Sequence, residues 1–401
     1  MLQNKRSSSF LKWWWSIDSL MFIFILSIIL IGAFLTATAS PGVAEKIGAP
    51  YFHFLYKQLV FLGTALGVVI LISLMSKKAI KRLALLGFIV TLILMVLVLF
   101  IGDETKGSRR WINLIGFSLQ PSEVLKPLYA VIVALILSSY NYKKRLFHLK
   151  SWNVYICLAI HLIICALLLM QPDFGMAITI SMVTIGQLFV AGLPLIWVLV
   201  AIIFFISATF TAYRMFPHVA NRINSFLNPE DSLSYQVEKS IESYVNGGIF
   251  GKGPGEGSVK LVLPDSHTDF IFAVAAEEMG ALFCMIIIIL FASIIIRAMI
   301  RISSTKDLFV IYAVVGVMMY FGIQSIFNIG VTLHILPTKG MTLPFISYGG
   351  SSALSFAIAI GIYLSLTKKT AFPNAHYITP NYNHMRSITH DTPSPEEISV
   401  M

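Results

Sequence analysis

Residues 17–37 read IDSLMFIFILSIILIGAFLTA, and this stretch decides the class of fold. A helix of about 20 apolar residues, rising 1.5 Å per residue, is about 30 Å long, which is the thickness of the hydrocarbon core of a bilayer. The run is too long for the apolar part of a cleavable signal peptide, and no clear small-residue cleavage site follows it. We therefore predict a retained first transmembrane helix.

Similar apolar runs recur along the chain, which has 401 residues, is 57% hydrophobic and is only 12% charged. Soluble domains carry about 25% charged residues. The sequence therefore predicts an all-α membrane protein, and no internal repeat is visible that would favour an inverted-repeat transporter. About ten transmembrane helices are expected, near residues 17–37, 54–75, 80–101, 122–139, 154–171, 175–191, 193–213, 270–296, 308–335 and 347–367.

The distribution of charge orients these helices. With both termini in the cytoplasm, most of the 29 Lys and Arg residues lie on the cytoplasmic side, as the positive-inside rule requires. The net charge of +10 comes from short patches between apolar runs, which excludes a basic nucleic-acid-binding face. We expect a cytoplasmic segment at 1–16, a membrane domain at 17–370, a large extracytoplasmic loop between helices seven and eight, and a disordered cytoplasmic tail at 371–401.

Four stretches on the outer side are more polar than simple connections require, and the first is Lys106–Pro127, KGSRRWINLIGFSLQPSEVLKP. Glu123 and Lys126 are three residues apart, so they share a face near the outer end of the fourth helix. They form either a local ion pair or part of a binding site. Arg109 and Arg110 are interfacial anchors or bind an anionic group.

The second and fourth stretches combine turns with polar residues. The motif QPDFG at Gln171–Gly175 is a tight turn in which Asp173 is a hydrogen-bonding residue or part of a site. The segment LPTKGMTLPFISYGGSS at Leu336–Ser352 contains Lys339 and leads into the tenth helix. Small residues there, such as Ser351, allow close helix packing or expose backbone N–H groups to a phosphate.

The third stretch lies in the long outer loop, at about residues 214–269. An amphipathic helix is predicted from the helical spacing of Leu233, Val237, Ile241 and Tyr244. The glycine-rich stretch Gly247–Gly257 that follows is not a P-loop, because no strand precedes it and Lys252 is followed by Gly253, where a Ser or Thr is needed.

The loop ends in the motif LPDSHTDF, which leads into the eighth helix and contains His267, Thr268 and Asp269. A carboxylate at the edge of a low-dielectric site is suited to accept a proton. The alternative is structural, because Thr268 or Asp269 would be a good helix N-cap. Two turns deeper, Glu277 and Glu278 are candidates for a functional site because buried carboxylates are costly in a membrane.

Together, these stretches resemble the SEDS family (shape, elongation, division and sporulation proteins). The likeness follows the same order over nearly the whole chain, and HTDFIFAVAAEEMG and LPTKGMTLPFISYGGSS are its most specific segments. The sequences at Pro337–Gly340 and Ser40–Gly48 are similar to the FtsW-type cell-division branch, and the RodA-type elongation branch is the near alternative. One departure is Asp265, where many members carry Glu.

The resemblance implies a ten-helix fold and peptidoglycan glycosyltransferase activity, in which lipid II is polymerised into β-1,4 glycan strands at the outer face of the bacterial inner membrane. It also implies that Asp269 is the essential catalytic residue and that Lys126 faces it across a cavity. The partners it implies are a class B penicillin-binding transpeptidase of the FtsI type and other division proteins, at the septum.

The hypothesis that follows gives Asp269 the role of general base for the acceptor sugar hydroxyl, with a lipid diphosphate as leaving group that needs cations. No cofactor or metal-ligand cluster is evident, and a divalent cation at the diphosphate is left open. Predicted to bind substrate are Glu123, Lys126, Arg109, Arg110, Asp173, His267, Thr268, Lys339 and Ser351. The rival hypotheses are a lipid II flippase, for which Glu277 and Glu278 are the main support, and a non-catalytic scaffold.

Overall fold

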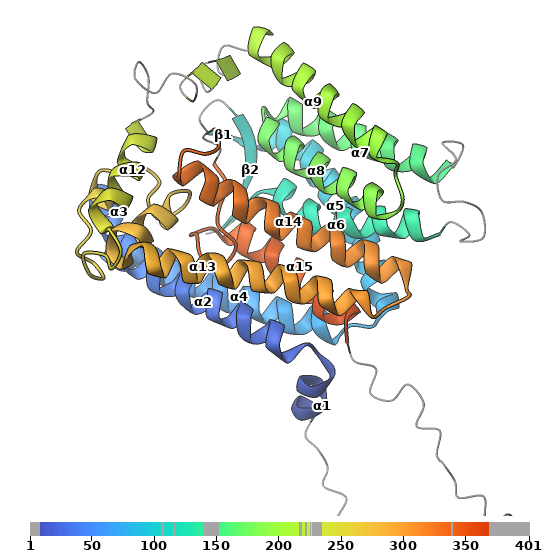
Figure 1. The fold of residues 1–401 in the computed structure, drawn as a ribbon, viewed down its shortest axis with the longest axis horizontal. Helices are drawn as coiled ribbons and strands as arrows, with labels where there is room; N and C mark the ends of the chain where they lie inside the picture. The colour runs from blue at the N-terminus through green and yellow to red at the C-terminus, as the bar shows by residue number, and fades with distance from the viewer. Residues whose placement is uncertain are drawn as a thin grey trace, which may run out of the picture.

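A computed structural model describes residues 9–105, 108–114, 117–139, 152–215, 219–220, 223–224, 226, 235–337 and 340–368. The predicted tail at 371–401 lies outside the described residues, as do Lys339 and residues 1–8 of the predicted N-terminal segment. The described part of the chain is predominantly helical (Figure 1).

Each of the ten predicted spans corresponds to an apolar helix. These are α2 (Ser19–Ala39), α4 (His53–Leu74), α5 (Lys77–Ile101), α6 (Pro121–Ser138), α7 (Trp152–Met170), α8 (Phe174–Val190), α9 (Leu195–Met215), α13 (Ile271–Ser303), α14 (Leu308–Thr332) and α15 (Gly350–Leu366). Among the described residues, seven helices are long and apolar enough to cross a membrane, and α8 and α15 are shorter apolar helices. The all-α membrane fold is confirmed.

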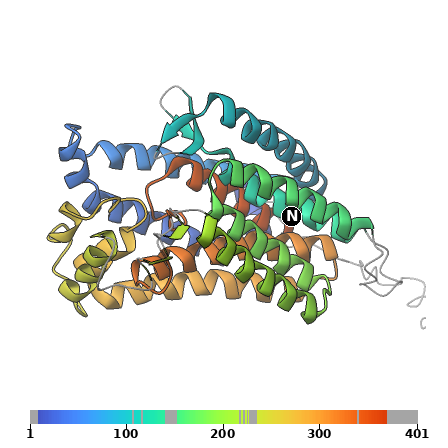
Figure 2. The same cartoon turned by 90° about the horizontal axis from the view of Figure 1, so that it is seen from above.

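The bundle is built around α14 and α6. Of the 18-residue apolar stretch in each helix, 83% is buried in α14 and 72% in α6. The buried share is only 28% in α5 and α13 and 22% in α7. α15 packs against both α4 and α6, and α9 lies at the periphery along α8 (Figures 1 and 2). Helices that are hydrophobic all round and buried belong at the centre of a bundle, while exposed apolar faces suit contact with lipid.

The two ends of the bundle differ in character. At one end, α1 (Ser9–Ser16) meets the start of α2, where Arg297 pairs with Asp18 at 2.9 Å and the Tyr363 hydroxyl donates to the same carboxylate at 3.2 Å. The opposite end carries α3 (Pro41–Lys46), α12 (Tyr235–Gly247) and the 3₁₀ turn η1 (Val259–Leu261) (Figure 1). This separation agrees with the predicted orientation, in which the second end faces outward.

A small antiparallel sheet on the outer end was not predicted. It has the order β1-β2-β3, with β1 at Asp103–Thr105, β2 at Ser108–Leu114 and β3 at Phe117–Leu119. Glu104 pairs with Arg109 in register, and Asn113 pairs with Ser118. The outer strands β1 and β3 have only three residues each, too few to show period-two alternation in sequence, so the contacts with β2 reveal the sheet.

Helix α13 is broken at Gly280, whose φ of 79° and ψ of 176° are not helical, although a continuous span was predicted. The amides of Lys252 and Gly253 donate to the carbonyls of Glu277 and Glu278, at 3.0 and 2.9 Å. The first two helix amides after the break donate to loop carbonyls, at 2.9 and 3.3 Å. The outer loop therefore satisfies the backbone groups that the break leaves unpaired.

This docking explains two glycines of the stretch Gly247–Gly257. A Cβ at Gly247 would lie 1.9 Å from the Ala276 carbonyl oxygen, and one at Gly251, which has a φ of +81°, would lie 2.3 Å from the Glu278 carbonyl oxygen. Side chains larger than hydrogen would push the loop off the helix. Gly247 and Gly251 therefore allow close backbone contact with α13.

Candidate active site

The predicted pair on α6 forms a buried ionic cluster. Lys126 Nζ lies 2.9 Å from Glu123 Oε2 and also donates to Gln324 Oε1 at 2.9 Å. The Tyr320 hydroxyl donates to Glu123 Oε2 at 3.1 Å, and the Tyr320 ring lies 4.4 Å from the ammonium. Both charged side chains are buried. The local ion pair is thus present, and it extends into a network on the neighbouring helix.

One face of α14 connects this cluster to the segment that carries Asp269. Tyr320, Gln324 and Asn328 are spaced four residues apart, so their side chains lie along one side of the helix. Gln324 Nε2 donates to the Thr342 carbonyl oxygen at 3.1 Å. Asn328 Nδ2 donates to the backbone carbonyl oxygen of Asp269 at 2.8 Å. We call these three residues the α14 polar face.

Asp269 lies at the outer end of α13, immediately before the helix. It is partly buried, and a Cβ at Gly340 would lie only 2.9 Å from its Oδ2 atom, so the backbone at Gly340 lies against the carboxylate. Asn328 Nδ2 also donates to the Met341 carbonyl oxygen, at 2.6 Å, and so joins both segments. The carboxylate that the sequence singled out therefore sits at a junction of three elements.

The N-cap position of α13 is Phe270 and not Thr268 or Asp269. Helix α13 begins after Phe270, whose own side chain makes no capping hydrogen bond. The Thr268 hydroxyl donates to the Asp265 carbonyl oxygen at 3.1 Å, within the turn that precedes the helix.

His267 is packed between two aromatic rings. Its ring centroid lies 4.7 Å from that of Phe54 and 5.4 Å from that of Tyr348, and its backbone carbonyl oxygen accepts from the Tyr348 amide at 2.9 Å. Burial lowers the pKa of His267 to about 4, with Asp265 opposing the shift. The imidazole is therefore neutral at neutral pH and fixes the LPDSHTDF turn against the start of α15.

The first and second predicted stretches come together through Arg110. Its Nε donates to the Gln171 carbonyl oxygen at 3.0 Å, its Nη2 donates to the Pro172 carbonyl oxygen, and its Nη1 lies 3.8 Å from Asp173 Oδ2. Asp173 is also the N-cap of α8 and accepts from the Met176 amide at 3.1 Å. Arg110 thus fixes the QPDFG turn, and Asp173 has the structural role foreseen for it.

The other predicted residues are more dispersed. Arg109 is exposed and lies 3.5 Å from Glu104 on the sheet. Ser351 accepts from the Gln120 amide at 3.0 Å and donates to the Ser118 carbonyl oxygen at 2.8 Å, which ties the start of α15 to the sheet and α6. Ser351 therefore joins the fourth stretch to the first.

A small cavity lies beside the ionic cluster. Its volume is about 10 Å³, roughly enough for one water molecule. Lining it are Lys126, Tyr129, Thr179, Ile180, Val183 and Tyr320. Lys126 therefore faces α8 as well as α14. The implied arrangement, in which Lys126 faces Asp269 across a cavity, stays a prediction.

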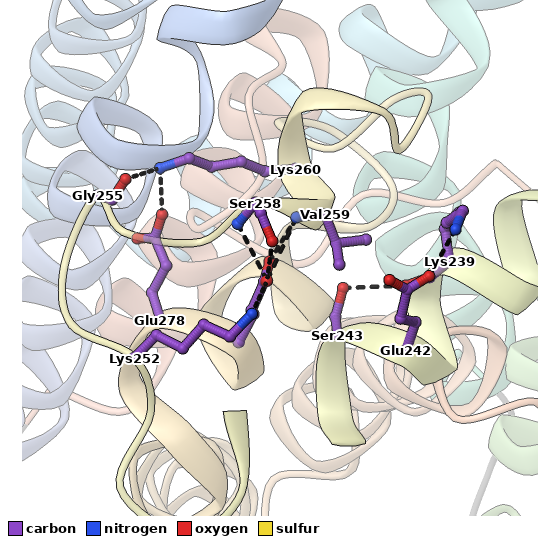
Figure 3. Close-up of polar contacts among 10 residues, drawn as sticks. Lys239, Glu242, Ser243, Lys252, Gly255, Ser258, Val259, Lys260 and Glu278 are labelled. Carbon is purple, nitrogen blue, oxygen red and sulfur yellow. Dashed lines mark hydrogen bonds and ion pairs between the residues drawn. The ribbon is translucent and has the colours of Figure 1, made fainter. Parts of the chain in front are cut away.

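Glu277 and Glu278, the main support for the flippase hypothesis, are paired with the outer loop. Glu277 Oε1 lies 3.1 Å from Lys252 Nζ, and Glu278 Oε1 pairs with Lys260 Nζ (Figure 3). Both glutamates are fully buried. Their charges are compensated locally, and neither side chain is open to a path through the membrane.

Sequence reasoning missed the α14 polar face. The available signal was a Tyr, a Gln and an Asn at intervals of four within an otherwise apolar helix. Polar side chains at membrane depth usually face the interior of a bundle and have a function.

Comparisons with known proteins agree with this fold. A family model described as "Cell cycle protein", covering FtsW, RodA and SpoVE, matches residues 18–371. A probable peptidoglycan glycosyltransferase FtsW from Caulobacter vibrioides is 36% identical over 89% of this chain and 90% of its own. A protein of the same description from Coxiella burnetii is 37% identical over 89% of this chain and 97% of its own.

Solved structures have the same architecture. One chain, from a study of polymerization and crosslinking by a peptidoglycan synthase complex, has a TM-score of 0.70 and 26% identity over 88% of this chain and 98% of its own. The rod shape determining protein RodA of Thermus thermophilus has a TM-score of 0.64 and 25% identity, covering 88% of this chain and 97% of its own. From its sequence and its fold, this chain belongs to the FtsW/RodA/SpoVE family of cell cycle proteins, which is the SEDS family.

Proposed function

We propose that this protein is a peptidoglycan glycosyltransferase of cell division, which polymerises lipid II at the outer face of the inner membrane. The observation that carries the proposal is the position of Asp269, a partly exposed carboxylate at the outer end of α13 whose backbone is held by Asn328 of the α14 polar face. The names of the curated relatives support both the reaction and the division role over a RodA-type role in elongation.

In the proposed reaction, the Asp269 carboxylate accepts the proton of the 4-hydroxyl of the acceptor's N-acetylglucosamine. The oxygen then attacks the anomeric carbon of the donor's N-acetylmuramic acid, and the bond to the lipid diphosphate breaks, with its electron pair leaving on the diphosphate. A single displacement inverts the α-linked donor to a β-1,4 product, so one base is sufficient and no covalent sugar–enzyme intermediate forms.

The leaving diphosphate gains negative charge, and nearby cations lower the barrier to its departure. Lys126 is the first candidate, because its ammonium is fixed by Glu123 and Gln324 and is therefore preorganised. Arg110, which is partly exposed beside the QPDFG turn, is the second. Arg109 and Lys339 remain candidates from the sequence. A divalent cation at the diphosphate is left open, and the described part of the chain has no group of three or more His, Cys, Asp and Glu side chains placed to hold one.

We also propose that the protein works with a class B penicillin-binding transpeptidase at the division septum, together with other division proteins. The likeness to a chain studied in a peptidoglycan synthase complex supports a partner of this kind. Such an arrangement would let strands be crosslinked as they are made.

The test uses purified full-length protein with its transpeptidase partner and labelled lipid II in detergent, where transport across a membrane has no meaning. We expect glycan strands from wild type and none from Asp269→Ala or Asp269→Asn. The matched control is Glu45→Gln, which neutralises an exposed carboxylate at the same end of the molecule and should leave polymerisation unchanged. Polymer from Asp269→Ala would remove the catalytic assignment. No polymer from wild type would refute the glycosyltransferase and favour the flippase.

A further inference from the structure

The break in α13 separates the segment next to Asp269 from the part of the helix that crosses the membrane. Residues 271–279 precede Gly280, and the helical residues 281–303 follow it. A continuous helix would transmit its orientation directly from one part to the other. Because Gly280 is not helical, the direction of segment 271–279, and with it the placement of Asp269, must be fixed by other contacts.

Those contacts come from the outer loop. Glu277 Oε1 accepts from Lys252 Nζ at 3.1 Å, from the Ser258 amide at 3.0 Å and from the Ser258 hydroxyl at 3.2 Å, and Glu277 Oε2 accepts from the Val259 amide at 3.0 Å. The adjacent Glu278 pairs with Lys260 (Figure 3). We call the two ion pairs Lys252–Glu277 and Lys260–Glu278 the loop clamp.

The charged groups of the loop clamp indicate that it fixes the orientation of segment 271–279 and does not only fill space. Two adjacent, fully buried carboxylates are costly at this depth, and apolar residues would fill the same space without a charge to compensate. Lys260 also donates to the Gly255 carbonyl oxygen at 2.7 Å, so its ammonium joins the loop backbone to the helix. Charged pairs of fixed geometry hold one orientation, whereas apolar contacts allow sliding.

The outer loop is itself anchored to the helix that carries the α14 polar face. Within α12, the Ser240 hydroxyl donates to the Thr332 carbonyl oxygen at 2.7 Å, and the Tyr244 hydroxyl lies 2.9 Å from the Thr332 hydroxyl. Asn328, one turn earlier in α14, holds the Asp269 backbone carbonyl. The loop, segment 271–279 and the outer end of α14 are therefore linked as one unit.

We infer that Glu277 and Glu278, with Lys252 and Lys260, are positioning residues that fix segment 271–279 so that the Asp269 carboxylate points at the acceptor hydroxyl. This inference rests on the proposed glycosyltransferase function. The glutamates lie eight and nine residues beyond Asp269, about 12 Å along a helix, so they act through the segment and not on the reacting atoms.

The experiment compares Lys252→Met and Lys260→Met with the conservative variant Lys260→Arg in the lipid II assay. Loss of either ammonium should lower kcat about 10- to 100-fold with little change in KM, because a 1 Å misplacement of a catalytic group can cost about 100-fold. Lys260→Arg, which keeps the charge, should restore most of the rate. Lys252→Met should still fold, because the Ser258 and Val259 amides continue to bond Glu277.

The matched control is Lys239→Met. Lys239 pairs with Glu242 at 2.6 Å within α12, in the same outer loop, and this pair is partly exposed (Figure 3). Its loss should leave kcat unchanged. Amide hydrogen exchange gives a second measurement, in which segment 271–279 should exchange faster in Lys260→Met than in wild type while the centre of α14 does not change.

Two outcomes would overturn the inference. One is a wild-type kcat in both Lys→Met variants. The other is a fall in kcat that is matched by a rise in KM and a general loss of protection, without rescue by Lys260→Arg. In either case, wild-type polymerisation and an inactive Asp269→Asn would leave the proposed function standing, whereas an inactive wild type would refute the function itself.

Discussion

The buried ion pair on α6 gives the sharpest prediction, which concerns the change Lys126→Met. The Lys126 side chain is 2% exposed and that of Glu123 is 9% exposed, with 2.9 Å between the ammonium and the carboxylate. Removing the ammonium leaves Glu123 with one neutral side-chain donor, the Tyr320 hydroxyl. Breaking a buried pair in this way costs about 3–5 kcal/mol of unfolding free energy.

The reciprocal change, Glu123→Gln, should be milder. It leaves the ammonium bonded to Gln324 at 2.9 Å and 4.4 Å from the Tyr320 ring. A desolvated cation–π contact contributes about 2 kcal/mol, so the cost falls to about 1–3 kcal/mol. The double variant contains neither charge. Its cost should therefore be smaller than the sum of the two single costs by about 2 kcal/mol or more.

The assay is reversible unfolding of the purified proteins in mixed micelles, with far-UV circular dichroism followed as the denaturing detergent is increased. Wild type, the two single variants and the double variant form a complete cycle. If the destabilisations of the two single variants sum to that of the double variant within about 0.5 kcal/mol, the two charges do not interact. That result would refute the ionic cluster as described.

Three further predictions use the same unfolding measurement. Asp18→Asn should destabilise by about 2 kcal/mol or more, because Asp18 is buried and Arg297 is left unpaired; an unchanged midpoint would contradict this. Gly32→Ala should destabilise by about 1–3 kcal/mol, since its Cβ would lie 2.2 Å from a carbonyl oxygen. Gly63→Ala, with nothing within 4 Å, should instead stabilise by up to about 1 kcal/mol, and equal effects would refute the close approach. Burial lowers the folded-state pKa of His267 to about 4, below its unfolded value of about 6.5. The neutral imidazole therefore contributes about 3 kcal/mol to the free energy of unfolding above pH 6.5, and this contribution is lost as the pH falls toward 4. The difference in stability between wild type and His267→Gln should shrink over that window, and a constant difference would show that the imidazole is not buried as a neutral group.

Part of the candidate site follows from the sequence alone. Asp269, Lys126 and Glu123 stand out there because a charge at membrane depth is costly and so requires a partner or a function. Arg110 and Asp173 stand out separately, in two different stretches. Only the tertiary structure shows that Arg110 reaches the QPDFG turn, because no local sequence rule predicts a contact between residues 61 or more positions apart.

The rotation of α14 and the break in α13 were not predicted from the sequence, for physical reasons. The rotation of α14, which directs Gln324 and Asn328 toward Lys126 and Asp269, is set by packing against neighbouring helices. The break at Gly280 depends on the outer loop, because a glycine within a helix is ordinarily tolerated and gives no sign of interruption. The loop residues that satisfy the broken helix lie between 25 and 33 positions earlier in the chain.

The sequence by itself determined the approximate number and positions of the membrane helices, and it predicts their orientation. This is so because a bilayer requires apolar runs of one length and retains positive charge on one side, and both constraints act locally along the chain. The tertiary structure alone decided which polar side chains meet. Hydrogen bonds and ion pairs between helices depend on rotation and depth, and those are fixed only when all the helices pack together.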